Sequence, residues 1–142
     1  DNSSSQVVLS GSEEALDDIS QRIKAKRFLK LNVSGAFHSP FMKEPSLKFS
    51  EYLDNLEFNQ PSIPVISNSN PSLCNDANEL KVRLKNQMCN GVRWRETMDL
   101  MKENSISQMV EIGPSNVLGG LGKRHLKDVK ISQVSSADQI KY

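Results

Sequence analysis

His38 is the residue of this chain whose surroundings best suit acid–base chemistry. It follows the small residues 34–36 and precedes Ser39-Pro40. A serine followed by proline is typical of a helix N-cap with proline at the first helical position. An imidazole between a predicted strand and a predicted helix can face a cleft while rigid elements hold it, as a general base requires. Because lone histidines are more often structural or exposed, the rest of the chain has to support this interpretation.

No nucleophile accompanies His38 in a recognisable pattern. The chain has no Gly-x-Ser-x-Gly elbow, and Cys74 and Cys89 form neither a C-x-x-C pair nor a disulfide framework. Two such thiols are typical of a protein in a reducing cytoplasm. We expect no bound metal, because His38 and His125 lie far apart and neither is near an acid or thiol at ligand spacing. His125, beside two basic residues, is expected to complement the C-terminal end of a helix dipole.

Composition limits the classes of function. The 142 residues have the length of one ordinary domain, with 37% hydrophobic and 25% charged residues and a net charge of +1. Interspersed charges leave no basic patch for nucleic acid or an anionic membrane, and no apolar run reaches the roughly 18 residues that span a bilayer. The chain opens without an initiator Met or a signal peptide, so we expect it to come from the middle of a longer polypeptide.

Hydrophobic periodicity predicts strands that alternate with helices, which favours an α/β layered fold with a largely parallel sheet. The predicted strands are 6–9, 27–33, 63–67, 107–112 and 129–134, and the predicted helices are 12–26, 39–58, 76–89, 92–103 and 117–126. Pro45 is expected to end or kink the first turn of the second helix. The residues expected to pack the second and fourth helices are Phe41, Met42, Phe49, Tyr52, Leu53, Leu56, Trp94, Met98 and Met101.

Two further motifs favour packing over ligand binding. The stretch 111–118 is a strand–turn–helix unit, and open α/β sheets place ligands at such turns. It lacks the glycine pattern of nucleotide-binding loops, so close packing of a glycine-rich helix is the better interpretation. Arg93 and Trp94 lie side by side, as in some nucleic-acid contacts, but Trp94 is better explained as the core anchor at the start of a helix.

Five segments, in this order, resemble the C-terminal half of the malonyl-CoA:acyl-carrier-protein transacylase family of bacterial fatty-acid synthesis. They are residues 2–11 (Asn-x-x-x-Gln-x-Val-x-x-Gly), 35–42 around His38, 64–68, Gln87 with 92–94, and 111–114. The resemblance covers essentially the whole chain. It implies an α/β-hydrolase-like acyltransferase domain with a small ferredoxin-like subdomain inserted in it. Residues 1–33 would then be the end of the small subdomain and residues 34–142 the C-terminal part of the large domain.

The resemblance also implies a chemistry. In this family a serine attacks the malonyl thioester of CoA, and the phosphopantetheine thiol of acyl carrier protein then takes the malonyl group from that serine. His38 matches the general base, and Gln87 matches the residue whose backbone carbonyl orients the histidine. Asn2 is similar in position to an asparagine near the substrate cleft, and Phe37 resembles the residue that favours malonyl over methylmalonyl. No cofactor beyond the two substrates is implied.

This chain departs from the family pattern in three ways. The nucleophile elbow, the oxyanion segment and the malonate-binding arginine belong to the N-terminal half, so the 142 residues alone are expected to be inactive. Gly91 replaces the usual proline before Val-x-Trp, and Ser115 replaces the usual glycine after Gly-Pro. Two alternatives stay open: a non-catalytic half-domain that docks acyl carrier protein, and the acyltransferase domain of a polyketide-type synthase.

Overall fold

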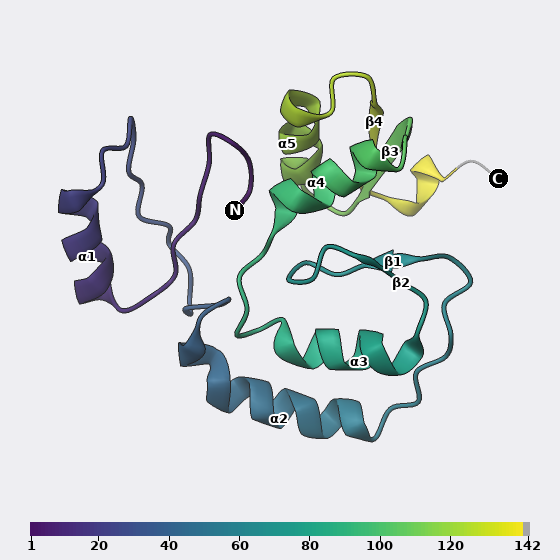
Figure 1. The fold of residues 1–142 in the computed structure, drawn as a ribbon, viewed down its shortest axis with the longest axis horizontal. Coiled ribbons are helices and arrows are strands. Elements are labelled where there is room, and N and C mark those ends of the chain that lie inside the picture. The colour runs from purple at the N-terminus through teal and green to yellow at the C-terminus, as the bar shows by residue number, and fades with distance from the viewer. Residues whose placement is uncertain (141–142) are drawn as a thin grey trace.

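The computed structural model describes residues 1–140, which form five α-helices, two short 3-10 helices and two small sheets, with α1 apart from the rest (Figure 1). The helices are α1 (Glu13–Arg22), α2 (Lys43–Asp54), α3 (Ala77–Asn86), α4 (Trp94–Glu103) and α5 (Val117–His125), with short 3-10 helices η1 (Pro40–Met42) and η2 (Ala137–Gln139). The strands are β1 (Val65–Ile66), β2 (Leu73–Cys74), β3 (Gln108–Ile112) and β4 (Lys130–Val134). None of the described helices has the length and apolar character needed to cross a membrane.

The C-terminal part is a strand–helix–strand unit in which β3 and β4 pair in parallel, with Gln108 opposite Lys130 and Ile112 opposite Val134. Helix α5 packs on these strands, and α4 contributes Met98 to a buried cluster with Leu121 and Leu126. A Cβ at Gly122 would lie 2.9 Å from the Ile131 side chain, so glycine permits this close approach. The sequence-based prediction of strand, glycine-rich helix and strand is confirmed here.

The middle of the chain forms a second layer, in which α2 and α3 pack together beside the hairpin of β1 and β2 (Figure 1). The predicted strand at 63–67 is present as the short β1, but it pairs antiparallel with β2, which the sequence analysis did not predict. The described residues therefore contain two separate two-stranded sheets, one parallel and one antiparallel. Only the C-terminal pair matches the expectation of parallel strands.

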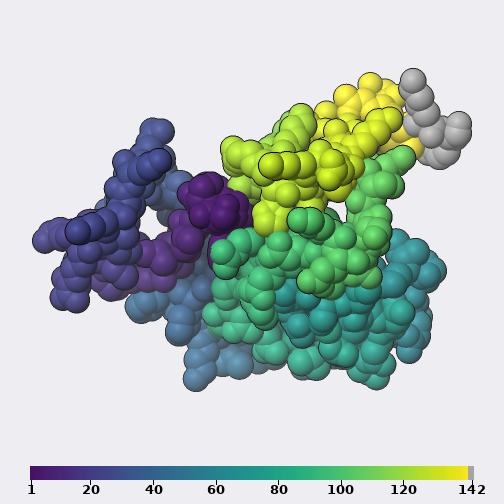
Figure 2. Space-filling model, turned by 45° about the horizontal axis from the view of Figure 1, so that its top comes forward, coloured from purple at the N-terminus to yellow at the C-terminus, as the bar shows by residue number. Residues whose placement is uncertain are grey.

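The predictions of strands at 6–9 and 27–33 are wrong. Both stretches lack regular structure and their side chains are exposed, and only a single bridge between Ser3 and Gln6 forms nearby. The helix between them, α1, is present and is capped by the Ser12 hydroxyl. This N-terminal region extends away from the body of the molecule (Figure 2). A strand needs a neighbour to satisfy its backbone groups, and the described residues provide none for these two stretches.

The region after His38 is helical, but its packing differs from the prediction. Pro45 lies in the first turn of α2, where its missing N–H breaks no intrahelical hydrogen bond, so the helix continues to Asp54. Met42 and Leu53 are buried as expected, whereas Tyr52 is 75% exposed. Phe41 and Leu56 are exposed in the same way. The apolar stripe of α2 is therefore only partly covered by the described residues.

An ion pair between Asp54 on α2 and Lys85 on α3 joins the two helices and gives a testable pH dependence. The hydrogen bond from Lys85 holds the pKa of the Asp54 carboxyl below its ordinary value. A carboxyl with a depressed folded-state pKa stabilises the fold above its unfolded pKa of about 3.9, and this contribution is lost as the pH falls through the folded value. Asp54→Asn should therefore lower the urea midpoint at pH 7, and lower it by less at about pH 3, which lies below the unfolded value. Glu51→Gln on the same helix is the control, and an equal loss at both pH values would contradict the prediction.

Candidate functional site

His38 lies in the tight turn that leads into η1. Its backbone φ is +64°, in the left-handed region that residues other than glycine seldom adopt. Such conformations cost on the order of 1–3 kcal/mol and persist where the surrounding structure enforces them, often at functional sites. The following Ser39 is the N-cap of η1 and Pro40 its first residue, as the sequence predicts. His38 is half-buried, so part of the residue stays accessible to solvent.

Three backbone carbonyls of the turn after α3 contact His38. The ring Nδ1 lies 3.0 Å from the Gln87 carbonyl oxygen and 3.1 Å from that of Asn90. The backbone N–H of His38 donates to the Met88 carbonyl at 2.8 Å. A carbonyl oxygen can only accept a hydrogen bond, so the proton of the neutral imidazole is assigned to Nδ1. The Nε2 lone pair is then free to accept a proton from another group.

Two contacts outside the site hold this turn in place. The turn begins where α3 ends, and α3 is attached to α2 by the buried Ser46, whose hydroxyl donates to the Lys85 carbonyl at 3.0 Å. Beyond the turn, the backbone N–H of Arg93 donates to the Asn68 carbonyl at 2.8 Å. The helix that follows His38 and the helix that precedes the turn thus pack on each other. This arrangement holds His38 against two acceptors that lie 49 and 52 residues further along the sequence.

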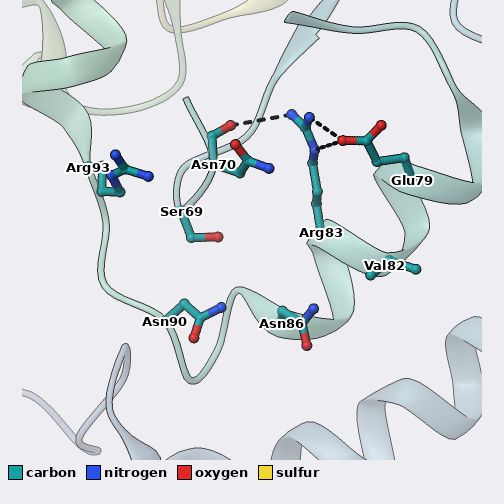
Figure 3. Close-up of a pocket in the computed structure, with 8 residues that line it drawn as sticks. All are labelled: Ser69, Asn70, Glu79, Val82, Arg83, Asn86, Asn90 and Arg93. Carbon is teal, nitrogen blue, oxygen red and sulfur yellow. Dashed lines mark hydrogen bonds and ion pairs between the residues drawn. The ribbon is translucent and has the colours of Figure 1, made fainter. Parts of the chain in front are cut away.

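A polar pocket of about 460 Å³ lies between α3, this turn and the loop at 69–70 (Figure 3). Its lining residues are Ser69, Asn70, Glu79, Val82, Arg83, Asn86, Asn90 and Arg93. The buried Arg83 donates to Glu79 and to the carbonyls of Asn70 and Ser72, so its charge is used within the fold. Arg93 donates to Glu96, and this hydrogen bond lowers the pKa of the Glu96 carboxyl and raises that of Arg93. Because its cations are already paired and His38 does not line it, we assign no chemistry to this pocket.

The other two candidate residues, Phe37 and Asn2, form no hydrogen bond with His38 in the described part of the chain. Phe37 is adjacent to His38 in the chain and is 49% exposed, with its ring beside Gly35. Asn2 donates its backbone N–H to Gln6, and its neighbour Asp1 forms an ion pair of 2.7 Å with Arg95 at the start of α4. No hydrogen bond within residues 1–140 links Asn2 to His38. The structure thus brings the Gln87 carbonyl to His38 and forms no hydrogen bond between His38 and Asn2 among the described residues.

Sequence reasoning missed two polar contacts made by histidines. The Asn90 carbonyl is a second acceptor for His38 Nδ1, and backbone groups leave no sequence signal beyond the Asn-Gly turn at 90–91. His125, at the end of α5 as expected, also lies 2.6 Å from the Asp99 carboxylate on α4. That pair joins two helices of the C-terminal unit. It has no contact with the His38 site among the described residues.

This fold corresponds to the C-terminal half of an α/β acyltransferase fold. The solved malonyl-CoA:ACP transacylase of Synechocystis sp. PCC 6803 superposes with a TM-score of 0.91, at 42% identity, over 97% of this chain and 47% of that one. No family model matches the chain. A malonyl-transacylase solved in complex with a type II polyketide-synthase acyl carrier protein superposes with a TM-score of 0.81 at 34% identity, over 90% of this chain and 42% of that chain.

The particular relatives are malonyl CoA-acyl carrier protein transacylases. The Synechocystis protein of that name is 41% identical over 140 residues, which are 99% of this chain and 48% of the relative. The chain is thus homologous to these transacylases, and it spans about half the length of the curated relatives it matches. The sequence-based resemblance is confirmed.

Proposed function

We propose that this chain is the general-base half of an enzyme that transfers malonyl groups from CoA to acyl carrier protein in fatty-acid synthesis. One observation carries the proposal: His38 Nδ1 lies 3.0 Å from the Gln87 carbonyl, which assigns the proton to Nδ1 and leaves Nε2 as the base. Gln87 acts through its backbone, so its role is to orient the imidazole. The homology to malonyl CoA-acyl carrier protein transacylases supports the same reaction.

His38 Nε2 moves one proton in each half-reaction. In the first, it takes the proton of the nucleophilic serine hydroxyl as the serine oxygen attacks the malonyl thioester, and it returns that proton to the departing CoA thiolate. In the second, it takes the proton of the phosphopantetheine thiol, and the thiolate attacks the acyl-serine. The released serine oxygen recovers the proton from Nε2. The imidazole is neutral again after each half-reaction, as a catalyst must be.

The remaining parts of the reaction come from outside these 142 residues. We propose that the serine and the groups that bind the malonyl carboxylate belong to an N-terminal half, which is the first partner of this chain. The chain then meets malonyl-CoA and acyl carrier protein, and it needs no cofactor beyond these substrates. That one similar transacylase was solved with its acyl carrier protein supports a direct contact between such proteins.

Further assignments belong to the same proposal. Phe37 would favour malonyl over methylmalonyl, and its half-exposed ring beside His38 supports a place at the acyl group. Asn2 would line the substrate cleft. Residues 1–33 would end a ferredoxin-like subdomain, and the projection of α1 and its flanking stretches away from the body in Figure 2 supports this division. The free thiols Cys74 and Cys89 support a cytoplasmic site of action.

A polyketide-type acyltransferase is the second candidate, because a structural neighbour works with a type II polyketide-synthase carrier. The two candidates share the chemistry of His38 and differ in the carrier protein that accepts the malonyl group. Transfer rates to a fatty-acid carrier and to a polyketide carrier separate them.

A chimera tests the proposal directly. This chain replaces the matching C-terminal half of the Synechocystis transacylase, and radiolabelled malonyl transfer from malonyl-CoA to holo acyl carrier protein is measured. We expect transfer by the chimera and none by the 142 residues alone. A folded chimera that binds acyl carrier protein but forms no malonyl-enzyme would contradict the proposal and favour the docking half-domain.

A further inference from the structure

Ser39 is a buried polar residue that the proposed mechanism does not use. Its exposed fraction is 3%, although it directly follows the half-buried His38. The hydroxyl donates to the Ala36 carbonyl at 2.6 Å and accepts a hydrogen bond from the backbone N–H of Phe41 at 3.3 Å. One side chain therefore closes the turn before His38 and caps the helix after it. A helix cap needs only the hydrogen bond from the Phe41 N–H. The hydrogen bond to the Ala36 carbonyl lies outside η1 and is additional to the cap.

The left-handed backbone of His38 explains why this hydroxyl matters. The backbone N–H of His38 reaches Met88 while its ring reaches Gln87 and Asn90, so two groups of one residue face the same turn. The dihedral φ sets the direction of the side chain relative to the N–H, so only a narrow range of φ allows both contacts. The observed φ of +64° lies in a region that residues other than glycine adopt uncommonly. It persists only if the bonds around it are stronger than its tendency to relax.

We propose that Ser39 is a positioning residue, which holds His38 in the left-handed conformation that sets Nδ1 against the Gln87–Asn90 turn. This inference rests on the proposed function and deepens it by naming the side chain that keeps the base in place. Without the hydroxyl, Ala36 and Phe41 lose their shared partner, and the turn can relax towards a negative φ. The relaxed turn moves the ring from its carbonyl acceptors, and the fraction of enzyme with a competent base falls.

The test uses the chimera with Ser39→Ala and Ser39→Thr. We expect Ser39→Ala to slow formation of the malonyl-enzyme in a single turnover by roughly 10–100-fold, because small misplacements of a catalytic group have effects of that size. The KM for malonyl-CoA should change little, since Ser39 does not face substrate in this proposal. Ser39→Thr keeps a hydroxyl at the same position and should restore most of the rate.

Two further variants distinguish a loss of His38 positioning from a general loss of folding. Ser50→Ala is the matched control, because the Ser50 hydroxyl also donates to a carbonyl but within α2, to Ser46 at 2.8 Å. Its rate should equal that of the parent. Ser39→Gly removes the hydroxyl while glycine remains an acceptable N-cap, so this variant reports the loss of positioning if Ser39→Ala is poorly folded. The ¹⁵N spectrum of selectively labelled histidine should show the Nδ1-protonated form of His38 in the parent and a mixture of tautomers in Ser39→Gly.

The outcomes separate the two proposals. The role of Ser39 would be overturned if Ser39→Ala and Ser39→Gly had the same rate per active site as Ser50→Ala. If His38→Ala were inactive in the same experiment, the proposed function would remain intact. Failure of Ser39→Thr to restore a rate lost in Ser39→Ala would also count against it. Full activity of His38→Ala would instead overturn the proposed function.

Discussion

Replacing His38 by alanine is expected to lower malonyl transfer by about 10²–10⁴-fold, the usual contribution of a positioned general base. The expectation follows from the site, in which Nδ1 is held by two carbonyls and Nε2 is the remaining nitrogen that can accept a proton. The fold should tolerate the change, because His38 is only half-buried and its replacement by alanine removes no buried charge. Stopped-flow or quench measurement of malonyl-enzyme formation in the chimera gives the rate.

The other histidine of the chain provides the control. His125→Ala removes an imidazole that is also bound to an acceptor, Asp99, but on α4 and away from the Gln87–Asn90 turn. Its transfer rate should stay within about twofold of the parent, since additivity between distant sites predicts little coupling. Comparable losses in the two variants would show that histidine replacement acts through folding, and near-parental turnover in His38→Ala would refute the assignment of the base.

The sequence predicted the C-terminal unit well and the N-terminal strands poorly, for one physical reason. Strands β3 and β4 pair with each other and are separated in the sequence by α5 and its loops. Each predicted strand therefore has a partner within the same segment of the chain. The stretch 27–33 alternates apolar and polar residues, as a half-buried strand does, but it has no strand to pair with among residues 1–140. Periodicity reports which face of a strand is apolar and cannot report whether a neighbour exists.

The site likewise combines features that the local sequence predicts with features that it does not. Ser39 and Pro40 are local signals, and the cap they predict is present. The contact between His38 and Gln87 joins residues that no spacing rule connects, and only the family resemblance pointed to it. The left-handed φ of His38 and the second carbonyl, from Asn90, had no sequence signal. Both accompany contacts between the His38 turn and the distant turn after α3, which local sequence does not report.

Glu111 offers a second large expected effect, this time on stability. It lies on β3 with an exposed fraction of 7%, and its carboxylate accepts from the backbone N–H of Leu118 at 3.2 Å and of Gly119 at 2.6 Å. These donors belong to the first turn of α5, whose N-cap residue Asn116 makes no side-chain cap of its own. Glu111 therefore supplies from the neighbouring strand the acceptor that a cap would supply, and it complements the positive end of the helix dipole.

Glu111→Ala should lower the free energy of unfolding by about 3 kcal/mol, because it leaves the buried N–H of Gly119 and the part-buried N–H of Leu118 without their charged acceptor. Glu111→Gln keeps one carbonyl oxygen but turns an NH₂ group towards a donor, so its loss should be intermediate. Glu103→Ala, an exposed carboxylate on α4, is the control and should stay within about 0.5 kcal/mol of the parent. Urea denaturation followed by the fluorescence of Trp94, the single tryptophan, gives each value. Equal midpoints for Glu111→Ala and Glu103→Ala would mean that water replaces the carboxylate without cost, and that α5 does not depend on β3 for its cap.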